Sequence, residues 1–214
     1  DLRRSRGLGD VYKRQLKPLH DTFCVKHINV CTYQAVSGSG KDGVEELLQQ
    51  SSAYIDQRSI DKKVYPKQIA FNSIPFVDCF LENNYTREEM KMVWETHKIL
   101  DENISVNPTA VRVPVLVGHA ESIYIETEKE IDIELAKNCL NEFAGISVID
   151  NVQEVDFPTS FEHGHGTDNV YVGRIRKGLS KNNSLNLWVV ADNVRKGAAL
   201  NSIQIAENLV GSEM

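Results

Sequence analysis

The chain has 214 residues, of which 41% are hydrophobic and 25% are charged, a composition typical of globular proteins rather than disordered or collagen-like ones. Its formal net charge of −6 argues against a nucleic-acid partner or an anionic membrane surface, since both require a basic protein surface. No apolar run approaches the ~18 residues that span a bilayer, and we therefore expect a cytoplasmic protein with no membrane partner.

The first fifteen residues differ from the rest of the chain. They contain five basic and two acidic side chains and no apolar periodicity of the strand or helix type. The string that ends in Val11, Tyr12, Lys13, Arg14 and Gln15 resembles a translated sequencing adapter. We therefore interpret residues 1–15 as a foreign, artefactual segment and begin the fold analysis at residue 16.

Hydrophobic periodicity predicts a mixture of strands and helices along the remaining chain. In chain order these are a strand over 27–36, a helix over 42–55, an irregular segment over 62–78, a helix over 86–100, strands over 110–118 and 122–126, a helix over 131–143, strands over 170–175 and 185–191, and a final helix that starts near residue 192 and includes Leu209. Because the elements follow no strict βαβ rhythm, we predict an α+β fold with a mixed, largely antiparallel sheet and helices packed on it.

The helix over 86–100 has the clearest signals. Thr86 and Glu89 have the spacing of a capping box. Helical spacing then predicts one apolar face that carries Met90, Val93, Trp94 and His97. Glu88 and Lys91 lie three residues apart and share a face of this helix, where a surface ion pair is the ordinary expectation.

Arg112 and His119 are candidate functional residues at the valine-rich strand. Valines at alternate positions from Val111 to Val117 predict one continuous strand. An arginine among valines needs an anionic partner, and histidine exchanges protons near neutral pH. The odd spacing places the two side chains on opposite faces of a straight strand, so a shared site requires a bend near Pro114 or Gly118.

A Gly/Ser loop, Ser37-Gly38-Ser39-Gly40, lies between a strand and a helix, where helix N–H groups favour a phosphate. It matches neither the Walker A pattern nor the dinucleotide fingerprint, and such loops are usually flexible connectors. The pair His163 and His165 lacks a third ligand at a recognisable spacing, and the four cysteines are widely scattered. We therefore predict no metal site.

Several longer motifs together resemble bacterial aspartate-semialdehyde dehydrogenase. They occur in that family's order, and they are residues 30–41 (VCTYQAVSGSGK), 69–75 (IAFNSIP), 86–91 (TREEMK) with 95–100 (ETHKIL), 111–115 (VRVPV) with His119, 172–177 (VGRIRK), and Asp192-Asn193 with 196–199 (KGAA). The resemblance covers all of residues 16–214.

This resemblance implies the domain organisation and the activity. The family combines an N-terminal Rossmann domain for NADP with a C-terminal catalytic and dimerisation domain, which resembles that of glyceraldehyde-3-phosphate-dehydrogenase-like enzymes. Its members interconvert aspartyl phosphate and aspartate semialdehyde through a cysteine thioester. By this resemblance, residues 16–192 are the catalytic and dimerisation domain of a homodimer, and 193–214 form a helix that packs on a nucleotide-binding domain.

The same resemblance implies roles for individual residues. His119 would be the general acid/base, and Gln34 would orient the reacting group. The substrate would be held by Arg112 at its carboxylate and by Glu88 at its amino group, while Lys91 would help to bind phosphate. The expected cofactor contacts are Ser37, Gly38 and Asn193.

The chain departs from the family pattern at the nucleophile. The family's reactive cysteine stands about ten residues before the motif matched here by residues 16–20, a position that falls in the 1–15 segment, which contains no cysteine. Cys31 lies where the family usually has a small residue, so we do not assign it as the nucleophile. We therefore expect this chain to be a truncated and inactive copy; the alternatives are a non-catalytic dimerising or binding domain and the related acylglutamyl-phosphate reductase.

Overall fold

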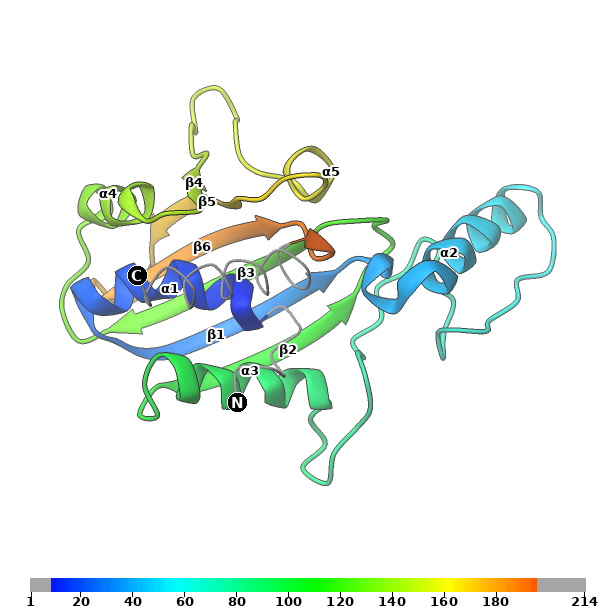
Figure 1. Ribbon diagram of the computed structural model, residues 1–214, viewed down its shortest axis with the longest axis horizontal. Helices are drawn as coiled ribbons and strands as arrows, with labels where there is room; N and C mark the ends of the chain where they lie inside the picture. Colours follow the sequence, from blue (N-terminus) through cyan, green and yellow to red (C-terminus); the bar gives the residue numbers. More distant parts are fainter. Residues whose placement is uncertain (1–8, 196–214) are drawn as a thin grey trace, which may run out of the picture.

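Six strands form one mixed sheet in the computed structural model, which describes residues 9–195 (Figure 1). They are β1 (Val25–Gln34), β2 (Ser105–Arg112), β3 (His119–Thr127), β4 (Ile146–Val148), β5 (Val170–Lys177) and β6 (Ser184–Ala191), in the order β2-β1-β3-β6-β5-β4. The pairs β1/β2 and β4/β5 are parallel and the other three are antiparallel. The predicted α+β class and the mixed, largely antiparallel sheet are confirmed.

Three of the described helices, α1 (Gly9–Phe23), α3 (Arg87–Ile99) and α4 (Ile133–Glu142), cover one face of this sheet. The other helical segments are the 3-10 turn η2 (Val36–Ser39), α2 (Gly40–Ile55) and α5 (Ser160–His163). Leu19 of α1, Met92 of α3 and Leu140 of α4 are buried in one core with Ile28 and Ile123 of the sheet. Helix α2 projects beyond the end of β1 (Figure 1). None of the helices within residues 9–195 is long and apolar enough to cross a bilayer.

The opposite face of the sheet carries a second set of side chains, at the alternate positions of each strand. We call it the open face and define it by half-buried residues of three adjacent strands: His27, Asn29, Cys31, Tyr33, Ser122, Tyr124, Asn186 and Trp188. Helices α1, α3 and α4 pack on the other face. The Tyr33 and Trp188 rings lie 5.3 Å apart, so aromatic surface is available here.

The predicted strand over 110–118 is wrong, because β2 ends at Arg112 and β3 begins at His119. Pro114 has no N–H to continue a ladder, and the chain turns back toward η2, where the N–H groups of Val36 and Ser37 donate to the carbonyls of Val115 and Leu116. The alternating valines therefore include a turn. β2 also begins earlier than predicted and tolerates Pro108 because it is an edge strand.

Other boundaries also differ from prediction. Helix α1 begins at Gly9, so residues 9–15 are helical although they show no apolar periodicity. The Gly/Ser segment is a 3-10 turn, and α2 starts at Gly40 rather than after Asp42. Strand β4 and helix α5 are too short to give a periodic signal. The predicted final helix falls mostly on residues 196–214, outside the described residues.

The capping box of α3 is confirmed, but its predicted apolar face is wrong. Glu89, Met92 and Thr96 are the buried residues of this helix, whereas Trp94 is 52% exposed. Two polar side chains are buried because their hydrogen bonds are satisfied: the Glu89 carboxylate accepts from the N–H groups of Thr86 and Ala110, and the Thr96 hydroxyl donates to the Met92 carbonyl. Glu89 thereby joins α3 to β2.

Candidate active site

Arg112 and His119 meet at one end of the sheet although they belong to different strands. Both are only 6% exposed. The backbone of Ala35 connects them: its carbonyl accepts from an Arg112 guanidinium nitrogen at 2.6 Å, and its N–H donates to His119 Nδ1 at 2.9 Å. The turn over 113–118, with Gly118 at φ +90°, supplies the change of direction that the odd spacing requires.

Gly38 of η2 closes over this pair. A Cβ atom added at Gly38 would lie 2.8 Å from an Arg112 guanidinium nitrogen and 3.3 Å from His119 Nε2. These distances are tighter than ordinary van der Waals contact, so only glycine leaves space beside the imidazole and the guanidinium. We call Gly38, Arg112 and His119, which are candidate catalytic residues, the catalytic cluster.

Burial determines the charge of His119. Together with the positive charge of Arg112, it lowers the pKa of the imidazole to about 3, so His119 is neutral near pH 7. Because Nδ1 accepts a hydrogen bond from Ala35, the single ring proton resides on Nε2. The Nε2–H group next to Gly38 is therefore a hydrogen-bond donor.

The neutral state of His119 predicts a pH-dependent stability. Between about pH 6.5 and pH 3 the unfolded chain binds a proton at His119 that the folded chain does not bind, so the free energy of unfolding falls as the pH falls. At pH 5 the expected loss from this residue is about 2 kcal/mol relative to pH 7. Urea unfolding at both pH values measures it, with His119→Gln as the variant that lacks this contribution.

Carboxylates also titrate in this range, but they contribute equally to both proteins, and the exposed His165 provides a matched control as His165→Gln. The NMR signal of the His119 Cε1 proton gives an independent readout, with no titration expected from pH 7 to pH 4.5. Equal pH dependence in all three proteins, together with a His119 titration near pH 6.5, would contradict the neutral buried imidazole.

Arg112 is a buried cation without an ion-pair partner among residues 9–195. Burial lowers the pKa of its guanidinium, yet arginine remains protonated in proteins. A buried, charged guanidinium requires compensation, and the Ala35 carbonyl provides only a neutral acceptor. An anionic group brought by a ligand would provide the missing charge, and a carboxylate has the matching two-oxygen geometry.

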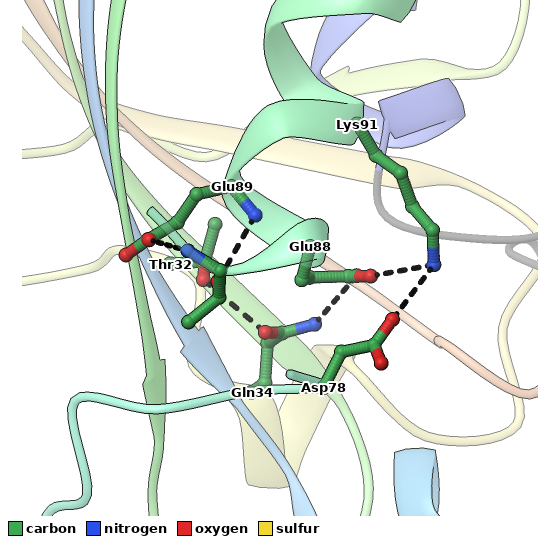
Figure 2. A network of polar contacts seen from close by, with 7 residues as sticks. Thr32, Gln34, Asp78, Glu88, Glu89 and Lys91 are labelled. Atoms are coloured by element: carbon green, nitrogen blue, oxygen red, sulfur yellow. Dashed lines mark hydrogen bonds and ion pairs between the residues drawn. The ribbon is translucent and has the colours of Figure 1, made fainter. Parts of the chain in front are cut away.

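A second set of polar side chains lies on the helix-covered side of the same strand end (Figure 2). Gln34 donates to Glu88 at 3.2 Å, and the other Glu88 oxygen accepts from Lys91 at 3.0 Å. Asp78 lies 3.7 Å from the Lys91 ammonium group. Burial lowers the pKa of Lys91, but the carboxylates of Glu88 and Asp78 outweigh burial and raise the pKa above its ordinary value.

Ser37 and Asn193 form a third set of contacts beside the catalytic cluster. The Asn193 amide oxygen accepts from the N–H of Gly118 at 3.0 Å, and its amide nitrogen donates to the Ser37 hydroxyl at 3.0 Å. Because Ser37 adjoins Gly38 and Gly118 adjoins His119, these contacts join η2 to the start of β3. The structure thus brings all eight predicted residues, Gln34, Ser37, Gly38, Glu88, Lys91, Arg112, His119 and Asn193, into three adjacent sets.

Two residues of the candidate site were not predicted from the sequence. Asp78 is the last residue of the irregular segment over 62–78 and gave no periodic or motif signal. Ala35 acts only through its backbone, so no property of its side chain indicates its role. For the pair His163 and His165, the structure shows only that His163 Nδ1 accepts from the Thr159 N–H; within the described residues no three His, Cys, Asp or Glu side chains are grouped closely enough to hold a metal ion.

The fold is that of an α+β domain of the kind found at the C-terminus of glyceraldehyde-3-phosphate-dehydrogenase-like enzymes. Comparison with known proteins gives the family. The chain belongs to the semialdehyde dehydrogenase dimerisation domain family, whose model matches residues 16–196.

Individual relatives agree with this family. The chain is 55% identical over 196 residues to aspartate-semialdehyde dehydrogenase of Shewanella violacea and 50% identical over 197 residues to that of Aquifex aeolicus, which is 91% of this chain in both cases. It spans 57% and 58% of the length of these relatives. The solved structure of aspartate semialdehyde dehydrogenase II from Vibrio cholerae superposes with a TM-score of 0.92 at 48% identity, covering 95% of this chain and 60% of that one.

Proposed function

We propose that this chain is the catalytic and dimerisation part of an NADP-dependent aspartate-semialdehyde dehydrogenase, which reduces aspartyl phosphate to aspartate semialdehyde through a cysteine thioester. The observation that carries the proposal is the catalytic cluster, in which Gly38 holds open a space between a buried neutral imidazole and a buried guanidinium. Such an enzyme supplies lysine, threonine and methionine biosynthesis, and we place it in the cytoplasm.

Arg112 binds the carboxylate of the substrate. The guanidinium is already buried and held by the Ala35 carbonyl, so little conformational freedom is lost when a carboxylate arrives. Glu88 holds the substrate amino group and Lys91 the phosphate. In the structure these two side chains pair with each other, so substrate binding exchanges their mutual ion pair for contacts with groups of opposite charge on the ligand.

His119 interacts with the oxygen of the reacting carbonyl group. As a neutral imidazole, His119 donates a hydrogen bond from its Nε2–H group to the oxygen that becomes negative when the thiolate adds, and this donor stabilises the developing charge. Ala35 fixes the ring by binding Nδ1. Gln34, anchored to Glu88, orients the reacting group from the adjacent strand.

The residues near the cluster fit a nicotinamide cofactor. A Cβ at position 38 would fill the space beside His119 Nε2, and the Ser37–Asn193–Gly118 contacts form a polar wall next to it. Ser37, Gly38 and Asn193 would contact the bound cofactor, whose reduced form, NADPH, would supply the hydride. Most of the nucleotide would be held by a Rossmann domain that precedes residue 16 in the whole enzyme, with residues 193–214 packing on it.

The nucleophile also belongs to that preceding part. All four cysteines of this chain are free and half-buried, and Cys31 lies on the open face whereas His119 lies on the helix-covered face. Burial raises the pKa of the Cys31 thiol, which disfavours the reactive thiolate. We therefore propose that the 214-residue chain alone is inactive.

Dimerisation is proposed to occur through the open face. Its half-buried Tyr33 and Trp188 rings and its neighbouring Ser122 and Asn186 side chains combine aromatic and polar groups as protein interfaces do. A second copy of the chain, packed face to face, would bury them. The matching family model describes a dimerisation domain.

Two further candidates are less well supported. A purely non-catalytic dimerising domain gives no reason for a buried cation beside a buried imidazole. An acylglutamyl-phosphate reductase would not need Glu88, because the nitrogen of its substrate is acylated and uncharged, and the relatives quoted above are aspartate-semialdehyde dehydrogenases.

The test joins the N-terminal half of a homologous enzyme to residue 16 of this chain. We expect the chimaera to reduce NADP in the presence of aspartate semialdehyde and phosphate, whereas the 214-residue chain shows only background. Strong turnover by the chain alone that is abolished by Cys31→Ser would overturn the assignment of the nucleophile. A folded chimaera that turns over N-acetylglutamate semialdehyde instead would overturn the substrate.

A further inference from the structure

Strand β5 is interrupted by a β-bulge. Its register with β6 shifts between Gly173 and Arg176, so an extra residue is accommodated at this point. Arg174 adopts φ +54°, a left-handed backbone conformation that is uncommon for a side chain of this size. The bulge resets the alternation of the strand, because Val172 and Ile175 lie three residues apart and are both buried in the core, whereas Arg174 and Arg176 are exposed.

The two arginines line a pocket of about 380 Å³ beside the open face. Ser122 of β3, Trp188 of β6, and Thr159 and Ser160 at the start of α5 complete its lining. This pocket is separate from the catalytic cluster, because Ser122 and Trp188 belong to the open face and His119 to the opposite face.

Close packing fixes the wall of this pocket. A Cβ atom at Gly173 would lie 2.3 Å from the Ile149 carbonyl oxygen and 2.5 Å from the Pro158 ring, so only glycine allows that approach. The Trp188 indole N–H donates to the Pro158 carbonyl at 3.0 Å. The segment that leads into α5 is therefore held rigidly against the bulge.

The pocket has an excess of positive charge. No acidic residue lines it, and neither Arg174 nor Arg176 forms an ion pair with any residue of the described part of the chain. Among the described residues, the hydrogen bond that these guanidinium groups make is from Arg176 to the Arg174 carbonyl at 2.6 Å. Two acids close to this segment already have partners: Asp150 pairs with Lys137 and accepts from the Ile175 N–H, and Glu162 accepts from the Thr159 hydroxyl. Two arginines without counter-ions in an acidic protein suit an oxyanion.

We propose that this pocket binds a small oxyanion, a phosphate or a carboxylate, through the guanidinium groups of Arg174 and Arg176, with the hydroxyls of Ser122 and Ser160 as further donors. The anion is either free in solution or a carboxylate side chain of a second copy of the chain that packs on the open face. The site does not depend on the proposed dehydrogenase activity.

Calorimetric titration with phosphate and with succinate tests the free-anion source. The titration uses the full chain with Lys91→Gln, which removes the phosphate contact proposed on the other face. Arg174→Gln/Arg176→Gln is compared with Arg58→Gln/Lys26→Gln, which removes the same charge from exposed positions elsewhere. Sedimentation equilibrium on the same proteins measures the dimer dissociation constant and tests whether the anion is a carboxylate of a second copy.

If the ligand is a free anion, we expect saturable binding. The affinity should fall at least fivefold in the Arg174→Gln/Arg176→Gln variant and should not fall in the Arg58→Gln/Lys26→Gln control. If the ligand is a carboxylate of the second copy, we expect no such binding. The dimer dissociation constant should instead be at least fivefold larger in the arginine double variant than in the wild type, and added salt should weaken the wild-type dimer in the same way. Differences below fivefold in both measurements would overturn the proposal. Circular dichroism verifies folding, and Arg176→Gln alone serves if the double variant unfolds.

Discussion

Replacing His119 by alanine in the chimaera is expected to lower kcat by ~10²- to 10⁴-fold, the range that a positioned acid or base contributes. The imidazole donates from Nε2 to an oxygen whose negative charge develops only in the transition state, so kcat and kcat/KM should fall together. Steady-state kinetics with aspartate semialdehyde, phosphate and NADP measure the effect.

A matched control is His165→Ala, which removes an exposed histidine outside the catalytic cluster. It should leave kcat unchanged. His119→Asn tests whether a hydrogen-bond donor alone suffices, and partial recovery relative to alanine is expected. A His119→Ala chimaera with kcat within threefold of the parent would remove His119 from the mechanism.

Replacing Arg112 by leucine is expected to act mainly on binding. The substrate carboxylate loses a buried guanidinium, an interaction for which loss of one charged partner costs about 2–5 kcal/mol. This corresponds to a rise in KM of roughly 30-fold or more. Because the contact exists in both the ground state and the transition state, kcat should change much less than KM.

Arg112→Lys is the informative second variant, since lysine retains the positive charge but cannot form the bidentate hydrogen bonds of a guanidinium group. Its KM should lie between those of the parent and Arg112→Leu. If KM for the semialdehyde stayed constant in both variants while kcat fell, Arg112 would be a positioning residue for His119 and not the carboxylate site.

Much of the fold follows from local sequence signals. Periodicity identified helices α2, α3 and α4 and four of the six strands to within a few residues, because each has a buried face that repeats at its own period. The prediction of a strand over 110–118 was wrong because the alternating valines extend across Pro114 into the turn. The prediction of the buried face of α3 was wrong because Glu89 and Thr96 are buried with satisfied hydrogen bonds. A hydrophobicity pattern cannot detect buried polar side chains of this kind.

The site was less accessible to local reasoning. Arg112 and His119 stood out chemically, but their proximity depends on β2 and β3 both bordering β1 and on Ala35 between them. Gln34, Glu88 and Lys91 were found through family resemblance, since 54 residues separate Gln34 from Glu88. Asp78 and the bulge at Arg174 gave no signal, because both depend on tertiary contacts and backbone geometry.

In the proposed mechanism, the catalytic cluster binds the substrate carboxylate at Arg112 and the substrate carbonyl group at His119. The most direct measurement is a crystal structure of the chimaera with bound aspartate semialdehyde. We predict two hydrogen bonds from the Arg112 guanidinium to the carboxylate and one from His119 Nε2 to the carbonyl oxygen. A semialdehyde bound with its carboxylate on another residue and its carbonyl beyond hydrogen-bonding reach of His119 would contradict the claim.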